Sequence, residues 1–179
     1  NASPMPLNGF AIQVNKNPFG FGPAQALEVP DVAPGSSAEI SLPMAAGQLL
    51  SNTAPTNPLF LQVAIKNSLD IFYFNVPFDL SAVMVESGAL GRDQFTQIWQ
   101  RVGEGRQHAT AVNADRAMNA DAVRSRLALD NVHYVAQRQV DGGSVLYVSS
   151  ATTNSCTILA EVTVSASSPS VKIVTRTET

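Results

Sequence analysis

The first half of the chain alternates apolar and polar side chains in short runs with a period of two. Phe10, Ile12 and Val14 form one run, and residues 61–65 form another. A third run covers residues 39–42, and turn-forming stretches lie at residues 17–20, 34–36 and 54–58. Short, half-buried strands joined by frequent turns are typical of an antiparallel sandwich. The pattern therefore predicts an immunoglobulin-like antiparallel β-sandwich over residues 1–84.

One further strand, expected over residues 70–76, carries aromatic side chains on both of its faces. Phe72, Phe74 and Val76 share one face because side chains alternate along a strand. Tyr73 points the other way, so we expect its ring to face solvent or a partner.

The spacing of apolar residues becomes helical after residue 88. Phe95, Ile98 and Trp99 lie at positions i, i+3 and i+4, which predicts an amphipathic helix over residues 92–101. Trp99 is the only tryptophan, and it admits two interpretations. Either it closes a small core beneath the helix, or it stays half-exposed as an anchor site for a short peptide. The second use suits an indole because it offers a large apolar face and one N–H donor.

The rest of the second half is predicted to be a helix followed by strands. A polar connection runs through residues 103–105, and Asn119 is a good N-cap for a helix that continues through Leu127. Strands are then expected at residues 132–140, 144–150, 157–164 and 170–175. Helices followed by antiparallel strands make residues 85–179 an α+β unit. We therefore expect a domain boundary between residues 84 and 85.

The tripeptide Asp-Gly-Gly at residues 141–143 predicts a tight hairpin that places two side chains on one surface. With the two glycines as the loop, Arg138 lies directly opposite Tyr147. With the aspartate and the first glycine as the loop, Arg138 is shifted by two positions but stays on the same face as Tyr147. A three-residue loop would separate them. If the first helix borders this face, Trp99, Arg138 and Tyr147 form an aromatic and basic patch.

The charges are distributed unevenly. The net charge is −3 and the isoelectric point is near 5.2, which argues against nucleic acid as the main partner. Planar guanidinium groups suit bidentate contacts with carboxylates, so their clustering favours acidic peptides as ligands. The alternative is that each arginine lies on a solvated helix face. All arginines fall in the second half, at positions 92, 101, 106, 116, 124, 126, 138 and 176.

Signatures of catalysis are weak. His108 and His133 have no second ligand at metal-binding spacing, and no phosphate-binding loop or nucleophile elbow occurs. Cys156, the only cysteine, has no basic neighbour in sequence and is expected to be an inert buried thiol. We therefore expect no enzyme activity, cofactor or metal.

The cysteine content and the absence of a long apolar stretch predict that the protein resides in the reducing cytosol. A single cysteine rules out an internal disulfide, and no apolar stretch is long enough to cross a membrane. The first residues lack both the order of a signal peptide and an initiator methionine, so the sequence is expected to be a fragment.

Several blocks of the sequence resemble a known family. Residues 10–20 read FAIQVNKNPFG, residues 61–67 read LQVAIKN and residues 71–74 read IFYF. These blocks closely resemble the C-terminal appendage, or ear, of the β-adaptins, the large β subunits of clathrin adaptor complexes. The resemblance spans roughly residues 8–165, and the Asn-Lys-Asn-x-Phe-Gly block is its most specific part. It continues through residues 92–99, 119–121, 135–140, 146–147 and 158–161.

The resemblance implies a β-sandwich subdomain followed by a platform subdomain that receives short motifs of accessory proteins. These motifs are often helices that carry phenylalanines and an arginine, and Glu161 would receive the arginine. A second site on the sandwich side would centre on Tyr73. The peptide-binding residues implied on the platform are Trp99, Arg92, Arg138, Tyr147 and Glu161.

The sequence also departs from the family pattern. Gln100 and Gln137 replace lysines that the family usually carries beside the tryptophan and before the platform arginine. Both changes are expected to weaken the attraction for acidic motifs. The resemblance further implies that the first sandwich strands and a closing helix lie outside this chain, which would expose a sheet edge and apolar surface.

The resemblance implies a non-enzymatic module of a clathrin adaptor complex in vesicle-mediated intracellular protein transport. The expected partners are accessory and endocytic proteins with Phe- or Trp-containing acidic or helical motifs, clathrin, and the other adaptor subunits. The expected location is cytoplasmic, at the periphery of clathrin-coated membranes of the plasma membrane, the Golgi or both. Contact with the membrane would be indirect.

Two alternatives remain open at this point. The first is a coatomer-type appendage with the same architecture. The Asn-Lys-Asn block and Tyr73 favour the clathrin adaptor over this alternative. The second is an extracellular immunoglobulin-like adhesion module, which the single cysteine and the absence of a secretory segment disfavour.

Overall fold

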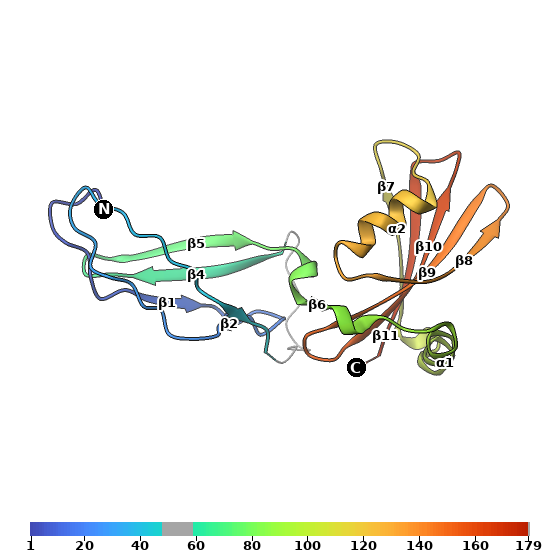
Figure 1. The fold of residues 1–179 in the computed structure, drawn as a ribbon, viewed down its shortest axis with the longest axis horizontal. Helices are drawn as coiled ribbons and strands as arrows, with labels where there is room; N and C mark the ends of the chain where they lie inside the picture. The colour runs from blue at the N-terminus through green and yellow to red at the C-terminus, as the bar shows by residue number, and fades with distance from the viewer. Residues whose placement is uncertain (48–58, 179) are drawn as a thin grey trace. The chain divides into compact units, whose positions relative to one another are not determined.

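The chain forms two compact units. A computed structural model describes residues 1–47 and 59–178, and it divides into Asn1–Leu80 and Ser81–Thr179 (Figure 1). This division falls a few residues before the boundary expected after residue 84. The turn expected at residues 54–58 lies outside the described residues.

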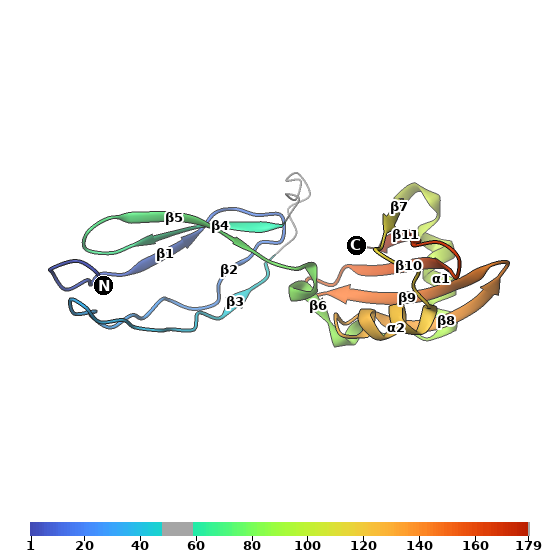
Figure 2. The same ribbon diagram turned by 90° about the horizontal axis from the view of Figure 1, so that it is seen from above.

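The first unit contains a three-stranded antiparallel sheet in the order β1-β4-β5. A separate ladder joins β2 to β3, and Figure 2 shows these two strands in a layer apart from the sheet. The strand bounds are β1 (Ala11–Val14), β2 (Gly22–Pro23), β3 (Met44–Ala45), β4 (Phe60–Lys66) and β5 (Ile71–Pro77).

The alternation in β4 has the expected effect on burial. Leu61 and Val63 are buried, whereas Gln62 between them is exposed. The strand expected at residues 39–42 is wrong, because the chain there is not paired and Ile40 is 41% exposed. Period-two alternation favours a strand only where one face is covered and a neighbour supplies hydrogen bonds, and neither holds at Ile40.

β5 is an edge strand with an unusually open surface. Phe74 lies opposite the buried Val63, and Phe72 lies opposite Ile65, so both rings share the apolar face of β4. Phe72 is nevertheless 52% exposed, and Phe74 is 42% exposed. The face that carries these two rings is therefore only partly covered by the described residues, and β5 pairs there only with β4.

The second unit is a six-stranded antiparallel sheet with two α-helices. Five strands follow the order β6-β9-β10-β11-β7, and β8 pairs with β9 as well. The bounds are β6 (Met84–Val85), α1 (Arg92–Val102), β7 (Gln107–Asn113), α2 (Ala120–Ala128), β8 (His133–Val140), β9 (Gly143–Thr152), β10 (Thr157–Ser165) and β11 (Ser170–Glu178). Short 3₁₀ turns lie at Leu80–Val83, Glu86–Gly88 and Glu104–Arg106. The α+β class and both expected helices are confirmed.

β7 follows the polar connection at residues 103–105, and this strand was not predicted from the sequence. All its residues are exposed, and it pairs only with β11 in the described part of the sheet. An edge strand with solvent on both faces has no reason to alternate apolar and polar residues, so it left no periodic pattern.

The two helices lie on opposite faces of the sheet. Val123 of α2 joins a buried cluster with Leu146 and Val148 of β9. Phe95 of α1 instead contacts Tyr147, the residue between them, which points to the other face. Asn119 caps α2 as predicted, since its side-chain oxygen accepts from the backbone N–H of Ala122 at 2.7 Å. Neither described helix has the length and apolar character needed to cross a bilayer.

The β8–β9 hairpin has a two-residue loop. Val140 lies opposite Gly143, which leaves Asp141 and Gly142 as the loop, and Gly142 has a φ of +76° that favours glycine. A side chain on Gly143 would meet the carbonyl oxygen of Val164 at 2.2 Å, so the second glycine is required for close packing. Of the two-residue loops that the sequence left open, the structure therefore has the one formed by the aspartate and the first glycine.

The register places Ala136 opposite Tyr147 and Arg138 opposite Val145. Arg138 and Tyr147 therefore point to the same face of the sheet, which is the face that carries α1. The ladder shifts between Tyr134 and Ala136, so that Val135 forms a β-bulge beside the α1 face.

Candidate functional site

A cavity of about 390 Å³ lies between α1 and the strands β8, β9 and β10. We call it the platform groove. It brings together apolar, aromatic and charged side chains on the face of the sheet that carries α1. The lining residues are Arg92, Phe95, Thr96, Trp99, Gln100, Val135, Ala136, Gln137, Tyr147 and Glu161.

Three aromatic rings form the base of the platform groove. Phe95 is buried, and its ring stacks on Trp99 with centroids 5.6 Å apart and an interplanar angle of 13°. The ring of Tyr147 meets Phe95 edge-on at 5.8 Å. These are the offset-stacked and edge-to-face arrangements that aromatic pairs prefer. The helical spacing of Phe95 and Trp99 holds both rings on one side of α1.

Trp99 is half-buried and lines the cavity. Of its two interpretations, the structure therefore shows the half-exposed one rather than a ring sealed in the core. One side of the indole is occupied, because the guanidinium carbon of Arg176 on β11 lies 4.2 Å from the ring centroid.

Two charged residues border the platform groove. Arg92 is exposed at the first residue of α1. Glu161 is half-buried on β10, directly opposite Tyr147, and its carboxylate has no hydrogen bond or ion pair within the described part of the chain. A partly desolvated carboxylate without a cation is a suitable partner for an arginine or lysine of a ligand.

The expected site residues are only partly brought together. Trp99 and Arg92 line the groove from α1, and Tyr147 and Glu161 line it from the sheet. Arg138 is exposed and points to the same face, but it is not among the lining residues. Because the loop is Asp141-Gly142, Arg138 lies opposite Val145, which is two residues closer to the loop than Tyr147.

The two glutamines that replace family lysines differ in their surroundings. Gln100 is exposed beside the groove. Gln137 belongs to a strand position that faces α2, and its side-chain amide donates to the hydroxyl of Ser144 at 3.1 Å. Gln137 nevertheless lines the platform groove as Gln100 does, so both replacements change the charge beside the groove.

Tyr73 lies in the first unit and is strongly exposed. Its side chain is 78% exposed on β5, which agrees with the direction that strand alternation predicted. It stands between two shallow hollows of about 290 and 450 Å³ on the same face of the sheet. The first is shared with Asn15 and Gln62, and the second with Lys66 and Ile71.

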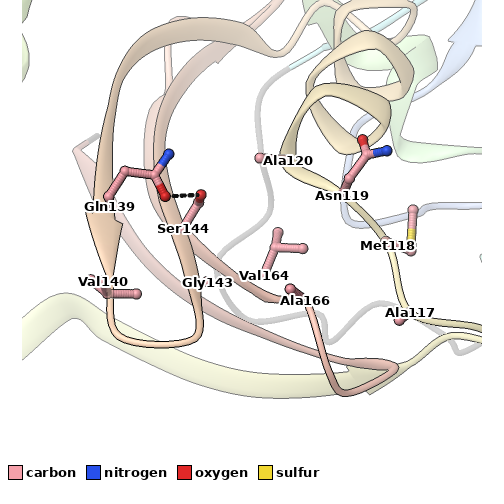
Figure 3. A pocket seen from close by; sticks show the side chains of 10 residues that line it. All are labelled: Ala117, Met118, Asn119, Ala120, Gln139, Val140, Gly143, Ser144, Val164 and Ala166. Carbon is pink, nitrogen blue, oxygen red and sulfur yellow. Dashed lines mark hydrogen bonds between the residues drawn. The ribbon is translucent and has the colours of Figure 1, made fainter.

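A further cavity of about 450 Å³ lies between the start of α2 and the tip of the β8–β9 hairpin (Figure 3). Its polar side chains are engaged with the protein. The hydroxyl of Ser144 donates to the Gln139 side chain at 3.0 Å, and Asn119 caps α2. This cavity therefore offers less for ligand recognition than the platform groove does.

The described residues contain no group of His, Cys, Asp and Glu side chains that could hold a metal ion. Cys156 is buried, as expected, and burial raises the pKa of its thiol. The thiol is therefore held in its neutral, unreactive form near pH 7.

Comparison with known families decides the relationship. The family model described as "Beta2-adaptin appendage, C-terminal sub-domain" matches residues 85–179. The matched segment contains α1, the whole six-stranded sheet except the first residue of β6, and every residue of the platform groove.

The chain belongs to the β-adaptin appendage family.

Individual relatives extend this β-adaptin likeness into the first unit. The chain is 36% identical over 165 residues to the AP-1 complex subunit beta-1 of Homo sapiens, an alignment that covers 92% of the chain. It is 35% identical to the subunit of the same name from Rattus norvegicus, and 26% identical to the AP-1 complex subunit beta of Dictyostelium discoideum. The chain spans only 17% of the length of these relatives.

Sequence reasoning missed three contributors to the platform groove of this β-adaptin appendage. Phe95 was assigned to a helical stripe but not to the base of a cavity, although its spacing from Trp99 carried that signal. The bulge at Val135 and the contact of Arg176 with Trp99 left no local signal, because both depend on the pairing of distant strands.

Proposed function

We propose that this β-adaptin appendage is a non-catalytic interaction module that binds short peptide motifs of accessory proteins and of clathrin. The observation that carries the proposal is the platform groove. It combines a half-buried tryptophan, two further aromatic rings and an unpaired carboxylate in one cavity. A concave apolar site with a few convergent polar groups is the usual form of a ligand site.

The groove suits a short helix with an aromatic residue and a basic residue. A phenylalanine of the ligand packs against the exposed part of Trp99 and against Tyr147. Glu161 receives an arginine of the ligand in a charge-assisted hydrogen bond. Arg92, at the exposed start of α1, attracts an acidic flank, and Arg138 on the same face extends this attraction toward the hairpin loop.

Such a contact is expected to be weak, on the order of micromolar, because a single small groove buries little surface. A coat that presents many copies raises the effective affinity without any new contact. Weak single contacts also allow accessory proteins to exchange as the coat forms.

Tyr73 marks a second proposed surface, on the first unit. A large exposed phenol on a strand, with hollows on either side, offers an anchor for a partner side chain. We assign clathrin or accessory motifs to this surface on the strength of the family resemblance.

The cellular context of the proposal comes from the relatives, which are named as β subunits of the AP-1 complex. We place the parent protein in an adaptor complex with other adaptor subunits, on the cytoplasmic side of clathrin-coated membranes. The family match favours this role over a coatomer-type appendage and over an extracellular immunoglobulin-like module.

Replacement of the groove tryptophan tests the proposal. Trp99→Ala removes the aromatic anchor, so we expect capture of accessory proteins from cytosol to be lost and binding of a synthetic Phe- and Arg-containing helical peptide to weaken by tenfold or more, about 1.4 kcal/mol. Leu129→Ala is a matched control, because Leu129 is a 78% exposed apolar residue beside α2 and does not line the groove. Circular dichroism must show that both variants fold. Full retention of capture by folded Trp99→Ala would refute the platform groove as the binding site.

A further inference from the structure

Arg176 contacts the indole of Trp99 and the main chain of α1 at the same time. Its guanidinium carbon lies 4.2 Å from the ring centroid, and its Nη1 donates to the carbonyl oxygen of Trp99 at 2.6 Å. A guanidinium over an indole is attracted by the ring quadrupole, and the attraction grows as the pair loses water. Both groups are half-buried. One residue thus holds both the ring and the backbone of Trp99.

Arg176 is itself fixed by its neighbours on the sheet. It lies directly opposite Gln107 of β7, and its Nε and Nη2 donate to the Gln107 side-chain oxygen at 3.2 and 3.0 Å. On its other side it pairs with Leu159 of β10, which is fully buried. All three guanidinium nitrogens therefore have a partner, and the planar group has a defined orientation.

The contact also secures the end of α1. The carbonyl group of Trp99 lies in the last turn of the helix, so its i+4 donor is the cap residue Gly103 rather than a residue of the helix. The N–H of Gly103 reaches this oxygen only at 3.4 Å, so Arg176 supplies the shorter bond. A positive charge at a helix C-terminus is also favourable for the helix dipole.

We propose that Arg176 is a positioning residue of the platform groove. It contacts the Trp99 indole and fixes the orientation of the ring beside Phe95, so that the exposed part of the ring lines the cavity. The part of the proposal that concerns ligand affinity rests on the proposed function of the groove. The part that concerns the ring does not.

Trp99 gives this proposal a direct readout, because it is the only tryptophan in the chain. Arg176→Met keeps the aliphatic stem and removes the guanidinium. We expect the tryptophan bands of the near-UV circular dichroism spectrum to lose about half of their intensity or more, and quenching of Trp99 fluorescence by acrylamide to increase. We expect the affinity for a synthetic helical peptide with two phenylalanines one turn apart and one arginine to fall about tenfold.

The control is a second arginine that links the same helix to the same strand. Arg101 of α1 pairs with Glu178 of β11, but its side chain is 65% exposed and the described contacts do not place it on the indole. Arg101→Met is therefore expected to leave both the spectrum and the peptide affinity unchanged. A purely structural bond between α1 and β11 would make the two variants behave alike.

The outcomes separate this inference from the proposed function. The positioning role would be overturned if folded Arg176→Met kept its tryptophan bands unchanged. It would also be overturned if the bands changed but the peptide affinity did not. If Arg176→Met does not fold, Gln107→Ala on the exposed edge strand decides: weakened tryptophan bands support the role and unchanged bands refute it. If the unmodified protein does not bind the peptide, the proposed function fails, and the spectra alone still decide whether Arg176 orients Trp99.

Discussion

The properties of Trp99 come mostly from residues that are distant in sequence. Its helical spacing from Phe95 could be predicted, because both residues lie within one turn of the same helix. The contact with Arg176 could not, since 77 positions separate the two residues. It depends on β11 pairing with both β10 and β7, which no local pattern encodes. Sequence reasoning thus singled out Trp99 but not the arginine that contacts it.

The two charged residues of the expected site illustrate the same limit. Glu161 was placed by family resemblance, and the ladder brings it opposite Tyr147. Arg138 was expected in the same patch, and it shares the face but not the lining of the groove. The difference depends on which two residues form the hairpin loop, a choice that the Asp-Gly-Gly sequence leaves open.

Glu161→Gln provides a test at the residue scale. The change keeps the shape of the side chain and removes its charge, so we expect the affinity for an arginine-containing peptide to fall about tenfold, as for loss of one charge-assisted hydrogen bond. Because Glu161 has no cation partner among the described residues, the thermal stability should be nearly unchanged. Isothermal titration calorimetry measures the affinity.

The control for this prediction lies in the ligand. A peptide with glutamine in place of its arginine should bind the unmodified protein and Glu161→Gln equally weakly. An equal loss of affinity for both peptides would instead show that Glu161 acts through the shape of the groove.

At the scale of elements, helices and strands could be predicted where one of their faces is buried. β4, α1 and α2 each have one buried side, and their periods of two or about 3.6 residues could be recognised in the sequence. β7 is exposed throughout and was missed. The run at residues 39–42 had the period of a strand but finds no paired neighbour. Periodicity reports burial of one face, and it does not report hydrogen bonding.

Asn119→Ala tests the capping of α2. Loss of the side-chain acceptor for the Ala122 N–H should cost about 1 kcal/mol and lower the melting temperature of the second unit by a few degrees. Ser125→Ala is the control, because Ser125 is exposed in the middle of the same helix and alanine is the better helix former there. Differential scanning calorimetry distinguishes the two.

The same variant also tests the separation of the two sheet faces. Since α2 and α1 lie on opposite faces, the affinity of the platform groove for its peptide should not change in Asn119→Ala. Weakened binding at a temperature where the protein is fully folded would contradict this separation.

At the scale of the whole molecule, the two proposed binding surfaces belong to different compact units. Tyr73 lies in the first unit and Trp99 in the second. Side chains that share no partner usually contribute independently to binding. Under the proposed function, the two surfaces would engage different motifs, and several weak contacts of this kind would together raise the effective affinity.

Tyr73→Ala tests this independence. We expect clathrin capture to decrease, while the affinity of the platform groove for its helical peptide stays within about twofold of the unmodified protein, inside the usual error of additivity. Pull-down measures the first quantity and fluorescence anisotropy the second. Tyr134→Ala serves as the control, because Tyr134 is an exposed tyrosine of the second unit that does not line the groove. A parallel loss of both activities in Tyr73→Ala would show that the surfaces are coupled.

Cys156 is the sole thiol, and it lies sealed at the corner where β9 turns into β10, with its N–H donated to the Thr152 hydroxyl at 3.1 Å. A reagent such as iodoacetamide reaches the sulfur only when that corner opens. The rate of alkylation therefore measures how often the sheet beneath the groove opens locally. A single chemical label placed there under denaturing conditions would also mark each molecule at one known position.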